Sequence, residues 1–382
     1  MKRMGIWLLA LALLVSFLPV GAKAVEMDIQ AKSAVLMDAA TGTVIYEQNA
    51  HEPLAPASVT KVMTMLLIME AIDDGRIGWE DTVTASEAAA AKGGSQIYLK
   101  VGESMSVSDM IKSIAVSSAN DCACAMAEHI AGSESAFVQM MNDRAKELGM
   151  NDTHFVNCTG LDDSADAAEH KTSAYDIALM SRELLANHPD IKKFTTIWMD
   201  TVRNGAFGLS NTNKLVRFYN GATGLKTGFT SGAGYCLSAS AQRDGMELIA
   251  VVMGCESSKA RFAACTGLLD HGFAGYAVIR PELGEQTQVA VRLGTAEQVK
   301  AVPSGESALL IQKGQRNLVT TQIQLEEEVT APVSRGQRLG TMTVRAEEQI
   351  LAQIPLVAES GIERLTWGQI FLRILRKACF SN

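Results

Sequence analysis

Ser58 and Lys61 are spaced so that they can act as a nucleophile and its base. A serine hydroxyl reacts poorly until a neighbouring base takes its proton. Here a segment with two prolines, Pro53 and Pro56, gives way to an apolar pattern with helical spacing from Val62 onward. Ser58 is therefore predicted at the start of a helix, with Lys61 one turn later on the same face. Burial, a second cation and the positive end of the helix would each lower the pKa of that lysine.

Two further motifs follow in order, Ser118-x-Asn120 and then Lys226-Thr227-Gly228. By itself a Ser-x-x-Lys spacing carries little weight, because both residues are common and about one such pair arises by chance in a chain of this length. The complete ordered trio is typical of serine enzymes that form an acyl intermediate, namely penicillin-binding proteins and class A β-lactamases. The three motifs are therefore predicted to meet at one site.

The elements around these motifs predict a sheet whose first strands pair with its last, with helices around it. Apolar runs bounded by turn residues indicate the strands, and residues recurring with helical spacing indicate the helices. The expected strands are residues 33–38, 43–46, 224–230, 235–241 and 247–253, and the expected helices are 58–74, 107–115, 122–131, 135–148, 173–187 and 258–271.

Beyond Pro281 the pattern changes to alternating apolar and polar residues, which indicates a small all-β domain without a catalytic constellation. The chain then ends in a segment that predicts an amphipathic helix lying in a membrane interface, the alternative being a helix packed on the β-domain. One helical face carries Trp367, Ile370, Phe371, Ile374, Leu375 and Ala378, and the other Arg373, Arg376 and Lys377.

The first 24 residues are predicted to be a signal peptide. Lys2 and Arg3 precede an apolar run over residues 6–15, and Ala22-Lys23-Ala24 has the small-x-small form of a cleavage site. The alternative is an uncleaved N-terminal anchor. The 382 residues are too many for one compact core, and the net charge of −8 argues against nucleic acid as a partner. We expect an exported, acidic protein of two domains.

Neither a metal nor a cofactor is expected. The closest cysteine pair among the seven, Cys122 and Cys124, is too narrowly spaced for a zinc motif and has no paired histidines. None of the six histidines forms H-E-x-x-H. No G-x-S-x-G or P-loop spacing is present either, so an α/β-hydrolase or a nucleotide-binding loop is not predicted. Most of the cysteines are expected to be small core residues.

These features resemble the low-molecular-weight penicillin-binding proteins that act as serine-type D-alanyl-D-alanine carboxypeptidases. The β-domain and the tail belong to the same pattern, so the resemblance covers the mature chain. The stretches that match are residues 55–64, 94–95, 101–103, 118–121, 148–150, 211–215, 224–228 and 233–235.

The resemblance implies an α/β (α+β) serine β-lactamase/penicillin-binding-protein-like transpeptidase fold with a small C-terminal all-β domain and an amphipathic C-terminal helix. The corresponding divisions are a signal peptide at 1–24, a carboxypeptidase domain at 25–275, a small β-sandwich domain at 280–360 and a membrane-anchoring helix at 364–382.

The chemistry assigns roles to the first two motifs. Ser58 is expected to attack a carbonyl and form an acyl-enzyme that water hydrolyses, with Lys61 as the base. Ser118 and Asn120 are expected to relay protons to the leaving amine and to bond the substrate amide. By resemblance, the backbone N–H groups of Ser58 and Phe229 form the oxyanion hole. Some family members carry histidine where this chain has Phe229.

The third motif is expected to bind the end of the substrate. Lys226 would lower the pKa of Lys61 and attract the terminal carboxylate, and Thr227 would donate its hydroxyl to the same group. Gly228 would let the strand edge approach the substrate closely. Arg261 stands where the family often has a carboxylate-binding arginine, the alternative being an ordinary surface arginine.

The implied function is removal of the terminal D-alanine from peptidoglycan stem pentapeptides ending in D-Ala-D-Ala, on the extracytoplasmic face of the cell membrane. β-Lactams would acylate Ser58 and inhibit the enzyme. A β-lactamase is one alternative, although residues 160–163 lack the glutamate pattern of that class. A non-catalytic penicillin-binding sensor of the cell wall is another, although the complete trio of motifs argues against an inactive site.

Overall fold

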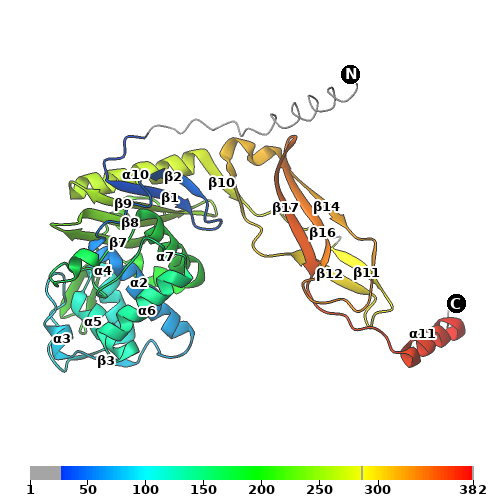
Figure 1. Ribbon diagram of the computed structural model, residues 1–382, viewed down its shortest axis with the longest axis horizontal. Helices are drawn as coiled ribbons and strands as arrows, with labels where there is room; N and C mark the ends of the chain where they lie inside the picture. Colours follow the sequence, from blue (N-terminus) through cyan, green and yellow to red (C-terminus); the bar gives the residue numbers. More distant parts are fainter. Residues whose placement is uncertain (1–26, 285–286, 381–382) are drawn as a thin grey trace, which may run out of the picture.

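The structure is a computed structural model that describes residues 27–284 and 287–380. The predicted signal peptide lies outside these residues. A body of mixed helix and sheet is followed by an elongated β-domain, and the last helix projects from the far end of that domain (Figure 1). The six cysteines described up to Cys265 are buried free thiols, as expected for core residues.

A five-stranded antiparallel sheet of order β2-β1-β9-β8-β7 forms the centre of the first body. Val35 of β1 pairs with Val251 of β9, so the predicted pairing of the first strands with the last is confirmed. Strand β7 is an edge strand, and it carries the third motif. The strands are β1 Ser33–Asp38, β2 Val44–Gln48, β7 Ala222–Thr230, β8 Gly234–Arg243 and β9 Met246–Cys255.

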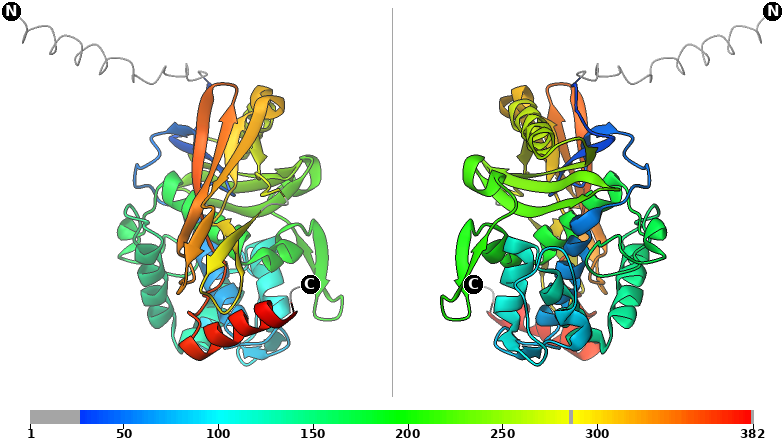
Figure 2. Two further views of the ribbon diagram at one scale, coloured as in Figure 1. Left: turned by 90° about the vertical axis from the view of Figure 1, so that its right-hand side faces the viewer. Right: turned by 90° about the vertical axis from the view of Figure 1, so that its left-hand side faces the viewer.

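Both faces of this sheet are covered, because alternate residues of β1 belong to two different cores. Val35 and Met37 pack with the helical block, whereas Ala34 and Leu36 pack with α10. Figure 2 shows α10 on one face and the other helices of this body on the opposite face. The main helices are α2 Lys61–Asp73, α4 Val107–Ser117, α5 Asn120–Ala131, α6 Glu134–Glu147, α7 Ala174–Asn187 and α10 Ser258–Gly275.

Serine N-caps start four of these helices. The hydroxyls of Ser106, Ser133, Ser173 and Ser257 each accept the backbone N–H three residues on. Helix α2 differs, since it is preceded by the 3₁₀ turn η1 Ala57–Thr60 and is apolar on nearly all sides. A helix of this kind is stable only inside a core, which is where α2 lies.

Short elements complete the helical block. The hairpin formed by β5 and β6 was not predicted from the sequence. The remaining elements are β3 Thr82–Thr84, α3 Glu87–Ala90, β4 Ser104–Ser106, η2 Ala167–Glu169, η3 Pro189–Ile191, α8 Lys192–Thr195, β5 Met199–Val202, β6 Phe207–Ser210 and α9 Leu215–Phe218.

The β-domain contains a six-stranded sheet of order β14-β16-β17-β12-β11-β15, which confirms a C-terminal all-β domain. It has its own apolar core around Met342 and Leu356. Strand β10 follows α10 directly and pairs with β13, which connects the two bodies by a hydrogen-bonded ladder. The elements are β10 Tyr276–Ile279, β11 Gln288–Arg292, β12 Gln298–Pro303, β13 Leu309–Gln312, η4 Lys313–Leu318, β14 Val319–Leu325, β15 Glu328–Thr330, β16 Arg338–Ala346, β17 Gln349–Ala358 and α11 Trp367–Phe380.

Candidate active site

Ser58 lies in η1, immediately before α2. The preceding residue, Ala57, has a φ of +49°, so the chain turns sharply into the helix at the nucleophile. Lys61 is the first residue of α2, and its Nζ lies 2.9 Å from the Ser58 hydroxyl. The predicted arrangement of serine and lysine, one turn apart at a helix start, is what the structure shows.

Lys61 is completely buried, and its Nζ also donates to the Thr159 carbonyl at 2.7 Å. Burial lowers the pKa of Lys61 from 10.5 to about 7. A neutral amine keeps its N–H bond to Thr159 and directs its lone pair at the Ser58 hydroxyl. Lys61 is therefore able to take the proton of Ser58 near neutral pH.

A buried histidine holds the turn that carries Ser58. The Val156 N–H donates to Nδ1 of His170 at 3.1 Å, so the proton of this ring is on Nε2. Nε2 lies 2.7 Å from the Thr60 hydroxyl, which donates to the Ala57 carbonyl at 2.9 Å. Burial lowers the pKa of His170 to about 4, so the ring is neutral at physiological pH. No motif in the sequence predicts a role for this histidine.

The loop that supplies the Thr159 carbonyl requires a glycine at position 160. Gly160 has a φ of +80°, and a Cβ added there would lie 1.9 Å from the Ala57 carbonyl oxygen. The Asn157 carboxamide oxygen accepts the N–H groups of Thr159 and Gly160, at 3.1 and 2.7 Å. This loop therefore packs directly against the nucleophile turn and fixes the partner of Lys61.

The second motif lies at the junction of two helices. Ser118 ends α4 in a left-handed conformation with a φ of +62°, and Asn120 begins α5. The Asn120 amide group donates to the Gly93 carbonyl at 2.7 Å. Its carboxamide oxygen is buried and accepts no hydrogen bond from the described residues. A buried acceptor without a partner is costly, so this oxygen is suited to a substrate N–H.

The third motif lies on the edge strand β7. Lys226 is buried, and its Nζ donates to the Thr227 carbonyl at 2.8 Å. Burial, together with the charge of the nearby Lys61, lowers the pKa of Lys226. The Thr227 hydroxyl donates to the hydroxyl of Thr212 at 2.6 Å, and the sequence analysis assigned no role to Thr212. The Thr212 N–H bonds the Val116 carbonyl near the end of α4, which links this segment to the second motif.

Gly228 is the point at which β7 crosses the nucleophile turn. A Cβ added to Gly228 would lie 2.6 Å from the Pro56 carbonyl oxygen and 3.1 Å from the Ser58 nitrogen. The absence of a side chain therefore lets the strand approach Ser58 itself, as well as leaving the strand edge open to substrate. Phe229 is 52% exposed, with its ring centroid 4.3 Å from that of Tyr235.

Arg261 of α10 is buried rather than a surface arginine. One guanidinium nitrogen donates to the Gly228 carbonyl at 2.9 Å and to the Cys236 carbonyl at 3.4 Å. The guanidinium also lies over the rings of Tyr235 and Phe262, at 5.3 and 4.9 Å. Its observed contacts thus hold the backbone of β7 beside the nucleophile turn.

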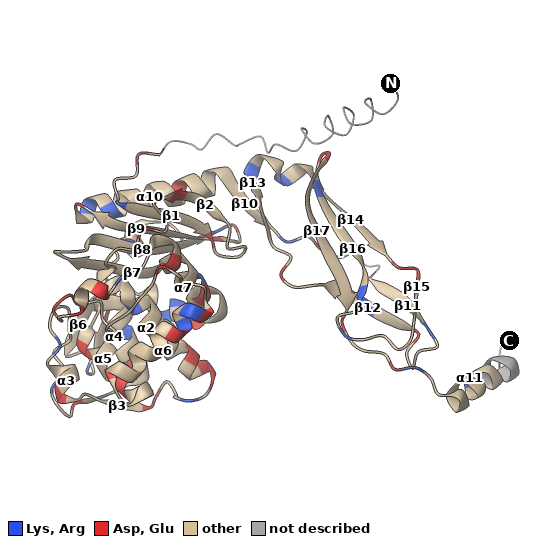
Figure 3. Ribbon diagram, viewed as in Figure 1, with Lys and Arg blue, Asp and Glu red and all other residues tan. Residues whose placement is uncertain are grey.

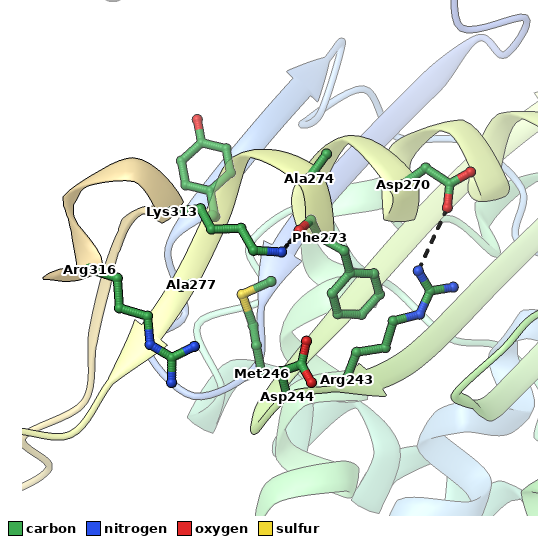
Figure 4. Close-up of a pocket in the computed structure, with 10 residues that line it drawn as sticks. Arg243, Asp244, Met246, Asp270, Phe273, Ala274, Ala277, Lys313 and Arg316 are labelled. Atoms are coloured by element: carbon green, nitrogen blue, oxygen red, sulfur yellow. Dashed lines mark hydrogen bonds and ion pairs between the residues drawn. The ribbon is translucent and has the colours of Figure 1, made fainter.

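Two other polar clusters lie apart from the motifs. A hollow of about 330 Å³ opens where α10 ends, between Arg243, Lys313 and Arg316 (Figure 4). Lys313 donates there to a backbone carbonyl of α10, so the hollow lies where the first body meets the β-domain.

Elsewhere Glu70 and Glu183 lie near His188. Arg144 bonds both carboxylates, at 2.7 and 2.6 Å, so these residues form an ion-pair network.

Comparisons with known proteins identify the family of the chain. Residues 20–257 match the D-alanyl-D-alanine carboxypeptidase family, and residues 282–364 match the C-terminal domain of penicillin-binding protein 5. The chain is 43% identical over 376 residues to the D-alanyl-D-alanine carboxypeptidase DacF of Bacillus subtilis, covering 95% of each chain. It is 34% identical over 360 residues to DacC of Escherichia coli, covering 91% of this chain and 87% of the relative.

Solved structures show the same fold. Penicillin-binding protein 5 from Haemophilus influenzae superposes with a TM-score of 0.76 at 29% identity, covering 89% of this chain and 99% of that one. The fold and the site thus define a penicillin-binding protein of low molecular weight. The chain belongs to the D-alanyl-D-alanine carboxypeptidase family, and its activity is that of a serine-type D-Ala-D-Ala carboxypeptidase.

Proposed function

We propose that Ser58 and Lys61 carry out the chemistry of this activity. The observation that supports the assignment is the 2.9 Å contact between the Ser58 hydroxyl and a buried lysine whose pKa is about 7. Lys61 takes the hydroxyl proton as Ser58 attacks the carbonyl of the penultimate D-alanine. Lys61 then gives this proton, by way of the Ser118 hydroxyl, to the leaving amine of the terminal D-alanine. Water then hydrolyses the acyl-enzyme.

The neighbouring groups position the substrate in this proposal. The unpaired carboxamide oxygen of Asn120 accepts an amide N–H of the stem peptide. The hydroxyls of Thr227 and Thr212, with Lys226 beside them, receive the terminal carboxylate. The backbone N–H groups of Ser58 and Phe229 stabilise the oxyanion. Arg261 acts through Gly228, whose carbonyl it bonds, rather than through the substrate.

β-Lactams are proposed as inhibitors that acylate Ser58. Penicillin-binding protein D2 from Listeria monocytogenes, solved in an ampicillin-bound form, is 31% identical, with a TM-score of 0.60 and coverage of 65% of this chain and 100% of that one. A β-lactamase would need a group that rapidly deacylates a penicilloyl ester. The family to which the chain belongs instead supports release of D-alanine as the main reaction.

Release of D-alanine should depend on a free C-terminal carboxylate. Amidating the C-terminus of a peptide ending in D-Ala-D-Ala should cost on the order of 1.5–3 kcal/mol in kcat/KM, the worth of a hydrogen bond to a charged group. The loss should be smaller in Thr227→Val, because the partner is already missing. D-Alanine release would be measured for acid and amide with both enzymes. Equal rates for the two substrates in the unmodified enzyme would contradict the proposal, as would penicillin hydrolysis faster than peptide hydrolysis.

We also propose that α11 attaches the enzyme peripherally to the extracytoplasmic face of the cell membrane. Its apolar residues are exposed, with Trp367 88%, Phe371 65% and Ile374 62% accessible to solvent. The sequence of the helix contains no acidic residue. In Figure 3 the described part of the helix shows no Asp or Glu, and Arg373 lies near the β-domain, its guanidinium 3.3 Å from the Gly294 carbonyl. Among the described residues, no helix has the length and apolar character needed to span a bilayer. An exposed apolar face next to basic residues fits an anionic membrane surface.

Removal of α11 should abolish membrane binding. The mature protein is expected to float with anionic vesicles, whereas a version ending at Gly361 stays with the soluble fraction because the apolar face is gone. A control variant, Trp367→Lys with Phe371→Lys, keeps the helix length and should behave like the truncation. Equal flotation of the full-length and truncated proteins would rule out the tail as the anchor.

A further inference from the structure

Tyr98 combines backbone strain with exposure. Its φ is +61°, a left-handed conformation that a bulky aromatic residue rarely adopts. The side chain is nonetheless 67% exposed, so burial of the ring does not offset the strain. A glycine at this position would avoid the strain entirely. Strain of this kind persists only where the surrounding contacts impose it, and it clusters at functional sites.

The structure around Tyr98 fixes the strained conformation from both sides. The buried Asp121 carboxylate accepts the N–H groups of Ile97 and Leu99, at 3.1 and 3.0 Å. Arg203 donates to the Ile97 carbonyl at 2.8 Å and to the Tyr98 carbonyl at 3.4 Å. Two charged side chains thus hold the residues on each side of Tyr98, and the ring is presented outward.

This segment is attached to the active site. The Asn120 N–H bonds the Ser95 carbonyl at 2.7 Å, and the Asn120 side chain bonds the Gly93 carbonyl at the same distance. Three residues before Tyr98, at Ser95, the chain therefore still runs beside the second motif. Tyr98 consequently lies on the segment that Asn120, the proposed partner of a substrate amide, contacts at Gly93 and Ser95.

An aromatic partner reaches Tyr98 from the hairpin of β5 and β6. The Tyr98 ring meets Phe207 edge to face, with centroids 6.4 Å apart. Phe207 starts β6, and the chain leads from there to Thr212, which bonds Thr227 of the third motif. Arg203 lies over the Phe207 ring at 5.3 Å, but its donors already serve Glu103 and two carbonyls. The surface formed by Tyr98 and Phe207 is thus aromatic, and the nearby Arg203 is already paired with Glu103.

We propose that Tyr98 is a substrate-binding residue that packs, together with Phe207, against the stem-peptide residue preceding the two D-alanines. The proposal rests on the function assigned to the site above. The terminal carboxylate is directed to Thr227, so the acyl part of the peptide passes Asn120 and continues toward the segment that carries Tyr98. Because Arg203 is already paired, the contact is with uncharged groups of that residue, not with a carboxylate.

The test compares substrates with and without the contacting group. Tyr98→Ala should lower kcat/KM about three- to tenfold for diacetyl-Lys-D-Ala-D-Ala, the range for losing an aromatic packing contact. It should leave N-acetyl-D-Ala-D-Ala unchanged, because that peptide lacks the preceding residue. Tyr98→Phe should retain activity toward both peptides. Val101→Ala is the matched control, since Val101 lies nearby and is 65% exposed, and it should have no effect.

A stability measurement separates this role from a structural one. Tyr98→Gly relieves the strain, so its unfolding midpoint should rise by roughly 2–4 °C while activity on the longer peptide falls. Lower stability together with equal losses on both peptides would overturn the proposal, as would unchanged activity on the longer peptide.

Acylation rates make the test independent of D-alanine release. In Tyr98→Ala, benzylpenicillin should acylate the enzyme several-fold more slowly, whereas 6-aminopenicillanic acid, which has no acyl side chain, should react as before. Selective loss of benzylpenicillin reactivity would support the subsite, whether or not the enzyme releases D-alanine. A failure to release D-alanine would refute only the proposed function. Equal slowing of both compounds would refute the subsite itself.

Discussion

Replacing Gly228 with alanine should reduce acylation of Ser58 at least about a hundredfold, the loss expected when a reacting group is displaced by about 1 Å. The new Cβ would lie 2.6 Å from the Pro56 carbonyl oxygen and 3.1 Å from the Ser58 nitrogen. Both atoms belong to the backbone, so neither can rotate away as a side chain would. Strand β7 or the nucleophile turn must move, and the proposed oxyanion hole takes one backbone N–H group from each.

The second-order rate constant for acylation by a fluorescent penicillin measures this effect. Gly267→Ala is the matched control, because Gly267 lies within α10 and an added Cβ would meet nothing within 4 Å. That variant should react like the unmodified enzyme, with equal or higher stability. A Gly228→Ala enzyme that folds and acylates at the normal rate would show that the close approach of β7 to Ser58 is not required.

Acylation should rise with pH and level off above about pH 7. Lys61 acts as a base only when neutral, and burial lowers its pKa from 10.5 to about 7. Below that value the protonated lysine has no lone pair, so the rate should fall about tenfold for each further pH unit. Above it the lysine is neutral and the rate no longer depends on its titration.

Lys61→Met should remove the rise of the acylation rate with pH below about pH 7. It should also lower the acylation rate by about 10²–10⁴-fold, the usual contribution of a general base. Lys193→Met is the control, since Lys193 is an exposed lysine paired with Asp190 on the surface. Both would be followed by acylation kinetics between pH 5 and 9. A rate that keeps rising toward pH 10, or a fully active Lys61→Met enzyme, would exclude Lys61 as the base.

The parts of the site that could be predicted from the sequence are those set by local spacing. Ser58 and Lys61 are one helical turn apart, so their contact follows from the helix alone. The pairing of β1 with β9 followed from short apolar strands at both ends of the domain. The position of Lys226 on an edge strand needed the whole sheet order, which no local pattern supplies.

Residues that act across long sequence distances were missed. His170 meets Thr60 across 110 positions, and nothing in the sequence around either residue indicates the contact. Thr212 lies within a segment that resembles the family, but only the folded chain shows its hydroxyl at Thr227. The left-handed backbone of Tyr98 was also unpredictable, because Asp121 and Arg203 impose it against the preference of the residue.

For Arg261 the two sequence-based alternatives were a contact with the substrate carboxylate and an ordinary surface position. The surface alternative does not describe the arginine, which is only 8% exposed. Its contact with the Gly228 carbonyl depends on α10 packing against the sheet, a tertiary feature that spacing along the chain does not reveal.

Locating the acyl group is the sharpest test of whether Ser58 is the nucleophile of this D-Ala-D-Ala carboxypeptidase. The enzyme would be labelled with a fluorescent penicillin, digested and examined by mass spectrometry, with D-alanine release from a D-Ala-D-Ala peptide assayed in parallel. We predict that the label is on the peptide containing Ser58, and that Ser58→Ala abolishes both labelling and D-alanine release. Labelling or D-alanine release that persists in Ser58→Ala would exclude Ser58 as the nucleophile.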